Sequence, residues 1–111
     1  MQHSQSFEEA VAKLRDRFRE EAEGRLNEFL TYMGAVEGGR DQSIALEGMI
    51  MQVHRVRGVA QTFGFADLGA VAQDLEEQLE ADRRAMSATD AVAGAEGKIK
   101  TFVTMMRDIA T

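Results

Sequence analysis

One histidine in this chain has neighbours that suit phosphoryl transfer. His54 is followed three residues later by Arg57 and four residues later by Gly58, in a stretch with helical periodicity. Residues three and four apart share one face of a helix. A neutral imidazole nitrogen can attack phosphorus, a nearby guanidinium neutralises phosphate oxygens, and a glycine leaves room for a second protein. We therefore interpret His54 as a candidate phosphoryl acceptor and Arg57 as the source of phosphate electrostatics.

A carboxylate distant in the sequence is expected beside this histidine. If the segments on either side of Gly64 form an antiparallel helical hairpin, His54 lies eleven residues before Phe65 and Glu76 lies eleven residues after it. At 1.5 Å per residue, both are then about 16 Å from the turn. A carboxylate on one ring nitrogen fixes the tautomer and leaves the lone pair of the other nitrogen available. The count predicts that Glu76 orients His54.

The same hairpin predicts a docking surface between His54 and the turn. It places Gly58 opposite Ala72 and Gly69 opposite Gln61, so small side chains would line a shallow strip that another helix could approach. The expected members of this strip are Gly58, Gln61, Gly69, Ala72 and Phe65. A structural explanation stands beside each functional one, because a histidine at the edge of an apolar stripe is often half-buried. Arg57 and Glu76 could equally be solvated charges.

Four amphipathic helices are expected to hold these residues in place. Apolar residues recur at steps of three and four over residues 7–36, 42–63, 66–86 and 89–110. The links are only a few residues long, which forces neighbouring helices to run antiparallel. We predict an all-α fold, an antiparallel up-down four-helix bundle that fills residues 1–111 as a single domain.

Residues typical of helix ends support these boundaries. Ser6 and Glu9 have the spacing of a capping box and predict a helix start. Gly38-Gly39 predicts a stop, and Ser87 or Thr89 predicts the N-cap of the last helix. The chain has no proline, the residue that helix interiors tolerate least.

Composition narrows the classes of function. Without cysteine the chain can form neither a disulfide nor a thiolate metal site. A net charge of −6 disfavours nucleic acid as a partner, and no apolar run approaches the ~20 residues of a membrane span. A di-metal bundle needs Glu-x-x-His pairs, and neither His3 nor His54 has a glutamate three residues before it. We expect a cytoplasmic, monomeric, protein-binding domain that holds no metal.

Taken together, these residues resemble the histidine phosphotransfer (HPt) domain of two-component phosphorelays. The family signature reads here as His54-x-x-Arg57-Gly58, a turn glycine at Gly64, and a Leu-rich third helix with Leu68 and Leu75-Glu76. The turn Thr62-Phe63-Gly64-Phe65 is most similar to the phosphotransfer domains of chemotaxis histidine kinases. In those domains a glutamate on the third helix hydrogen-bonds the histidine, and Glu76 holds the matching position. Arg57 replaces the commoner lysine, which keeps the charge but changes the donor geometry.

The resemblance implies that His54 accepts a phosphoryl group and exchanges it with an aspartate of a response-regulator receiver domain, or takes it from the ATP-binding domain of a histidine kinase. The chain has no Gly-rich phosphate loop, so we expect a covalent phosphoryl carrier with no ATP site and no cofactor of its own. Mg²⁺ is expected in the partner only. The alternative is a non-catalytic helical adaptor, or a pseudo-HPt domain that binds a signalling partner without phosphotransfer. A freestanding shuttle and a domain of a larger kinase are both compatible with the sequence.

Overall fold

Helices account for nearly all of the chain. The computed structural model describes the backbone of residues 2–110 and the side chains of residues 6–110. In that range the secondary structure is entirely helical: α1 (Gln2–Glu37), α2 (Gln42–Thr62), α3 (Ala66–Ala85), α4 (Ala88–Gly94) and α5 (Glu96–Ala110). In the described range no helix is long and apolar enough to cross a membrane.

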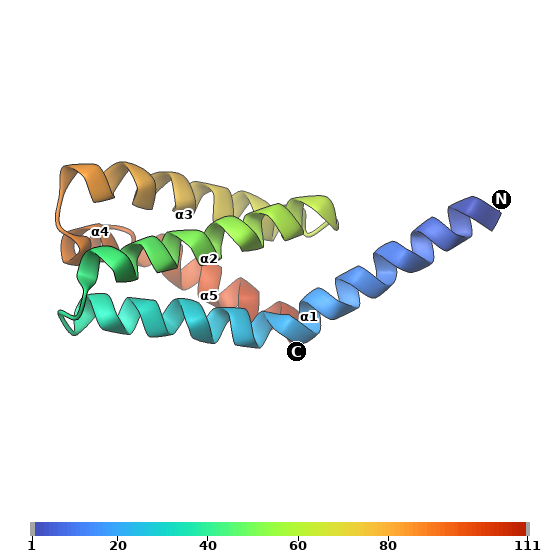
Figure 1. The fold of residues 1–111 in the computed structure, drawn as a ribbon. Coiled ribbons are helices and arrows are strands. Elements are labelled where there is room, and N and C mark those ends of the chain that lie inside the picture. Colours follow the sequence, from blue (N-terminus) through green and yellow to red (C-terminus); the bar gives the residue numbers. More distant parts are fainter. Residues whose placement is uncertain (1, 111) are drawn as a thin grey trace.

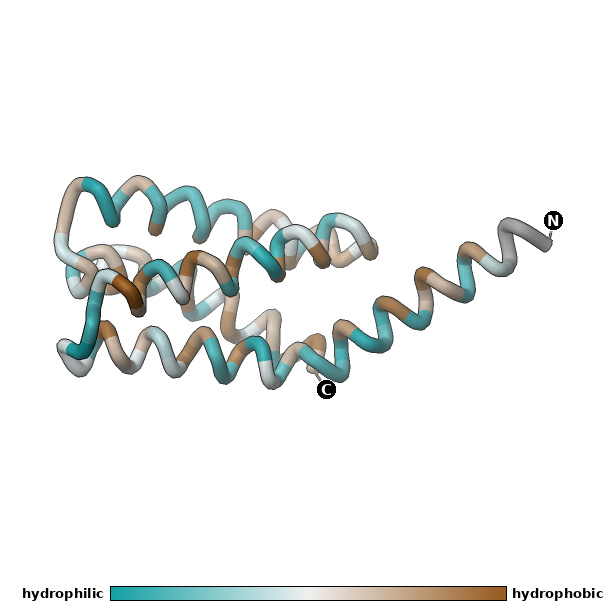
Figure 2. The backbone as a smooth tube through the Cα atoms, viewed as in Figure 1, coloured by the Kyte–Doolittle hydropathy of each residue, from teal (hydrophilic) through white to brown (hydrophobic). Residues whose placement is uncertain are grey.

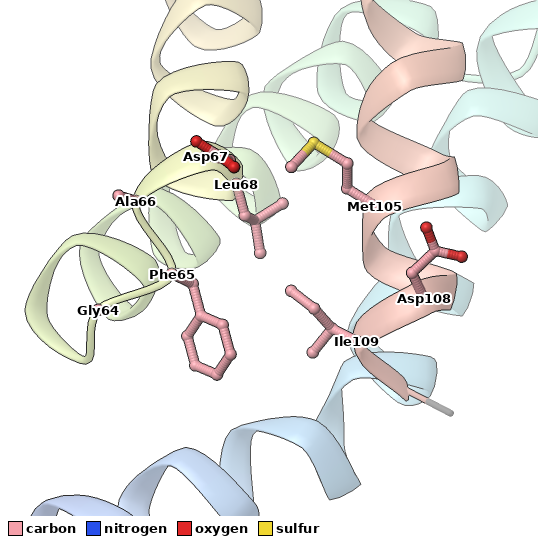
Figure 3. Close-up of a pocket in the computed structure, with 8 residues that line it drawn as sticks. All are labelled: Gly64, Phe65, Ala66, Asp67, Leu68, Met105, Asp108 and Ile109. Carbon is pink, nitrogen blue, oxygen red and sulfur yellow. The ribbon is translucent and has the colours of Figure 1, made fainter.

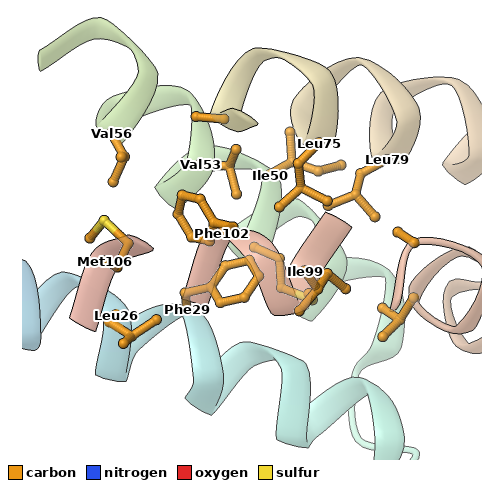
Figure 4. Close-up of a cluster of buried hydrophobic side chains, with 14 of the residues drawn as sticks. Leu26, Phe29, Ile50, Val53, Val56, Leu75, Leu79, Ile99, Phe102 and Met106 are labelled. Atoms are coloured by element: carbon orange, nitrogen blue, oxygen red, sulfur yellow. The ribbon is translucent and has the colours of Figure 1, made fainter. Parts of the chain in front are cut away.

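The long helices lie side by side around a single apolar core (Figure 1). The hairpin of α2 and α3 covers one side, and α1 and α5 cover the other. Side chains from all of these helices meet in the interior, where the rings of Phe29 and Phe102 make an edge-on contact with centroids 5.2 Å apart (Figure 4). The predicted antiparallel bundle is therefore present, built on the apolar stripes expected from the sequence.

Two glycines end helices where the backbone turns into the left-handed region. Gly39 has φ 73° just after the end of α1, and Gly64 has φ 84° in the turn between α2 and α3. Residues with a Cβ atom rarely adopt such positive φ angles, so glycine suits both positions. In the residue after Gly64, the backbone amide of Phe65 donates a hydrogen bond to the carbonyl oxygen of Ala60 at 2.9 Å. The stop predicted at Gly38-Gly39 and the hairpin turn predicted at residues 64–66 are both observed.

The fourth predicted helix is wrong as a single element. Residues 89–110 were expected to be continuous, but α4 ends at Gly94 and α5 begins at Glu96. The Gln78 side chain on α3 donates to the carbonyl oxygen of Gly94 at 3.0 Å. Kinks commonly arise where a side chain inserts into the helical hydrogen-bond ladder, and glycine is a poor helix former. The predicted N-cap is present one residue before α4, where Ser87 accepts a hydrogen bond from the amide of Asp90.

The first helix is longer than predicted and leaves the bundle. Ser6 already lies inside α1, so the Ser6–Glu9 spacing does not mark a helix start. α1 has 36 residues against 21 in α2, and its N-terminal part extends away from the other helices (Figure 1). The molecule measures 54 × 22 × 21 Å as a result. Apolar residues recur along this extension as they do in the bundle (Figure 2), yet burial begins only at Phe18.

Candidate functional site

His54 lies on a stretch of α2 that packs on the core, and its ring is in solvent. The flanking core residue Val53 is fully buried, and Ile50, one turn earlier, is 6% exposed. The histidine side chain itself is 65% exposed. Buried neighbours fix the helix backbone, while the exposed imidazole stays accessible to a second protein. This combination suits a residue that must be reached by a partner.

A carboxylate from α3 lies within hydrogen-bond distance of the imidazole. Glu76 Oε2 lies 2.8 Å from His54 Nδ1, and Glu76 Oε1 accepts a hydrogen bond from Arg57 Nη1 at 3.2 Å. An ionised carboxylate only accepts hydrogen bonds, so it selects the tautomer with the proton on Nδ1. The lone pair of Nε2 is then left on the side of the ring away from α3. The pairing of His54 with Glu76 expected from the hairpin count is present.

The guanidinium of Arg57 has a different binding partner from the one expected. The sequence assigned it to the incoming phosphate, but in the structure its guanidinium binds Glu76. Glu76 is only 14% exposed, so the arginine compensates a carboxylate that is largely withdrawn from water. In this arrangement Glu76 links Arg57 to His54 by one hydrogen bond to each.

Sequence reasoning missed a second arginine beside the histidine. A shallow hollow on the α1 side of α2 is lined by Arg25, His54, Arg55, Gly58, Val59, Thr62 and Phe63. Arg25 makes an ion pair with Glu21 at 3.1 Å, whereas Arg55 has no ion pair or hydrogen bond within residues 6–110. The sequence could have indicated Arg55 as a cation near the histidine, because Arg55 directly follows His54. The contribution of Arg25 depends on how α1 and α2 align, which the sequence does not state.

The predicted docking strip needs correction. Gly58 and Gln61 are exposed, and a Cβ atom on Gly58 would meet nothing within 4 Å. Gly69 and Ala72 are buried, and a Cβ on Gly69 would lie 3.0 Å from Gln61 Cγ of α2. The hairpin count gave correct heights but not which face each residue presents. Neither residue is accessible for docking in this structure, because Gly69 packs against α2 and Ala72 belongs to the hydrophobic core.

Phe65, the last residue of the predicted docking strip, packs against α1. Its ring lies 5.4 Å from the ring of Phe18, and the guanidinium carbon of Arg19 lies 5.3 Å from its centroid. It faces the end of the bundle, where Figure 3 shows it near Ile109 of α5. The role of Phe65 in docking therefore stays a prediction, and the contacts of its ring in this structure are with α1 and the end of the bundle.

The geometry combines an exposed, oriented imidazole with cations on a helical bundle, and comparison with known proteins agrees with it. A model of the Hpt domain family matches residues 13–109. The chain belongs to the Hpt domain family. This membership supports histidine phosphotransfer in two-component relays, with kinases and receiver domains as the partner classes. No curated protein and no solved structure matches the chain. The similarity to chemotaxis kinases therefore stays a prediction.

Among the described side chains, no group of three or more His, Cys, Asp or Glu residues is placed to hold a metal ion.

Proposed function

We propose that His54 is the phosphoryl acceptor and donor of this Hpt domain. The observation that carries the proposal is the contact of 2.8 Å between His54 Nδ1 and Glu76 Oε2, on a ring that is 65% exposed. One ring nitrogen is engaged by a carboxylate, and the other is available for attack on phosphorus. We expect the partner to be the receiver domain of a response regulator or the ATP-binding domain of a histidine kinase.

The proposed step conserves atoms and charge without an added reagent. The lone pair of Nε2 forms a bond to the phosphorus of an aspartyl phosphate, or of ATP, while the bond from phosphorus to the leaving oxygen breaks. The released carboxylate or ADP keeps that electron pair. The proton stays on Nδ1, where the Glu76 carboxylate stabilises the positive charge that develops on the ring. Transfer to a receiver aspartate is the reverse step, and any Mg²⁺ is expected on the partner.

The two arginines receive different roles in this proposal. Arg57 holds Glu76 by the bond to Oε1 and so keeps the carboxylate turned toward His54. Arg55 borders the hollow on the other side of the ring and has no competing partner among the described residues. We assign Arg55 to the oxygens of the transferred phosphoryl group, because an unpaired guanidinium can bind them in a bidentate manner.

Docking is proposed to use the exposed part of the strip, Gly58 and Gln61. Gly58→Leu would fill the hollow beside His54 and should weaken receiver binding at least tenfold, while the helical signal is kept. Gly34→Leu is the matched control, because Gly34 is also an exposed helical glycine with nothing within 4 Å of its Cβ position. Titration of both variants with a receiver domain would remove Gly58 from the interface if their affinities were equal to that of the wild type.

Labelling of the intact chain tests the function itself. Incubation with a phosphorylated receiver, or with kinase and ATP, should give acid-labile, base-stable phosphate that is lost in His54→Gln. Equal labelling of wild type and variant would contradict the proposal. Tight receiver binding with no labelling of the wild type would instead indicate the adaptor or pseudo-Hpt alternative.

A further inference from the structure

The N-terminal part of α1 carries an apolar stripe that no side chain of residues 6–110 covers fully. Phe7 is 70% exposed, Leu14 is 40% exposed, and Val11 between them is half-exposed. The same stripe continues into the core at Phe18, which is 2% exposed. We call residues 6–17 the α1 overhang. An isolated helix of this length is marginal in water, because most helices depend on the packing of their apolar face.

An apolar pocket lies at the end of the bundle from which the overhang emerges. It has a volume of about 260 Å³ and lies between the start of α3 and the end of α5. Figure 3 shows the side chains of Phe65, Leu68, Met105 and Ile109 converging on it. Phe65 links this end pocket to α1, because its ring contacts the ring of Phe18. An uncovered apolar stripe and an open apolar pocket therefore lie next to each other.

We propose that two copies of this chain associate in an antiparallel manner through their α1 overhangs, each placing Phe7 at the end pocket of the other. The spacing of the stripe fits such a pair. With the two-fold axis midway between Val11 and Leu14, Val11 lies level with Leu14 of the second copy. Phe7 then lies level with Phe18 of the second copy, which is the level of the end pocket. A two-fold axis satisfies both overhangs and both pockets at once.

The charges beside the stripe favour the antiparallel direction. Glu8 and Arg15 are seven residues apart and therefore lie on the same flank of the helix, where Arg15 Nε also donates a hydrogen bond to the carbonyl oxygen of Phe63. In an antiparallel pair the same flanks of the two helices face each other, so each Glu8 approaches Arg15 of the second copy. A parallel pair would set Phe7 against Phe7 and leave both end pockets empty. The antiparallel arrangement is the one that uses both features.

The contact is small, so the association should be weak. Each overhang contributes about three helical turns and one pocket, which falls below the 1,200–2,000 Å² of typical stable interfaces. The surface is also separate from the proposed phosphoryl site, since His54 lies on α2 and the end pocket lies between α3 and α5. The proposal replaces the monomer expected from composition and does not depend on the proposed function.

Sedimentation equilibrium of the intact chain from micromolar to millimolar concentration tests the proposal. The wild type should show a monomer–dimer equilibrium, and Phe7→Glu and Leu14→Glu should each weaken it at least tenfold. Ala12→Glu is the matched control, because Ala12 is exposed and lies about 120° around the helix from Phe18. A wild type that stays monomeric over this range, or a Phe7→Glu variant that associates normally, would overturn the proposal.

Cross-linking tests the direction of the pair. The chain has no cysteine, so single cysteines can be introduced without a background reaction. A mixture of Val11→Cys and Leu14→Cys chains should form disulfide-linked mixed dimers in preference to either variant linked to itself. Preferential linkage of each variant to itself would indicate parallel pairing and would contradict the register.

Discussion

Replacement of Glu76 by glutamine tests how the imidazole is activated. The amide keeps the shape of the side chain and can still accept from His54 Nδ1, but it lacks the negative charge that stabilises the phosphorylated ring. A hydrogen bond to a charged group contributes about 1.5–3 kcal/mol and a neutral one about 0.5–1.5 kcal/mol. The loss of roughly 1–1.5 kcal/mol corresponds to about a five- to tenfold slower reaction. Because His54 is 65% exposed, water weakens the effect, and we expect the lower part of that range.

A small phosphoryl donor such as phosphoramidate separates this chemical effect from docking. The rate at which the intact chain gains phosphate can be followed by mass spectrometry for wild type, Glu76→Gln and Glu77→Gln. Glu77 is the matched control, because it is the next carboxylate on α3 and hydrogen-bonds Gln73 instead of His54. His54→Gln defines the background of the assay.

The helical spectrum of each variant shows whether a change in phosphorylation rate comes from the chemistry or from a loss of folding. Glu76→Gln should keep the folded spectrum, since its partners are the exposed His54 and the partly exposed Arg57. A variant that is folded and reacts at the wild-type rate would refute the reasoning that Glu76 activates His54. Loss of the folded signal would show that Glu76 is required for the structure.

Four further outcomes follow from the structure. Arg55→Gln should slow phosphorylation by the small donor a few-fold, and this difference should shrink at high salt, because Arg55 is exposed. Arg57→Gln should slow the same reaction with a smaller salt effect, since it acts through a carboxylate that is 14% exposed. Gly34→Ala should raise the free energy of unfolding by about 0.5–1 kcal/mol in chemical denaturation. Gly48→Ala should gain less or lose stability, because its Cβ would lie 2.6 Å from the Tyr32 ring.

The central pair of the site could be predicted because it depends on local rules. Helical rise is constant, and Gly64 marks the turn, so equal counts on either side bring His54 and Glu76 to one height. Their side chains also lie at the edges of their apolar stripes, where two packed helices present them to the same groove. The second contact of Glu76, to Arg57, depends on rotamers that spacing alone does not determine.

The features that sequence analysis missed depend on contacts between distant segments. The break between α4 and α5 coincides with a hydrogen bond from Gln78, a residue of another helix. The overhang has the same apolar spacing as the buried part of α1. This spacing marks an apolar face, but it does not report whether the neighbouring helices are long enough to cover that face. Gly69 and Ala72 were placed at the right height but on the wrong side, since the counts carried no information on rotation between the helices.

The position of the phosphate tests the central claim most directly. The chain contains two histidines, His3 and His54, so ¹⁵N-histidine NMR of the phosphorylated protein would show two resolved ring systems. We predict that the His54 ring is phosphorylated on Nε2 and keeps its proton on Nδ1, while the His3 ring is unchanged. Phosphate on His3, or on Nδ1 of His54, would contradict the account.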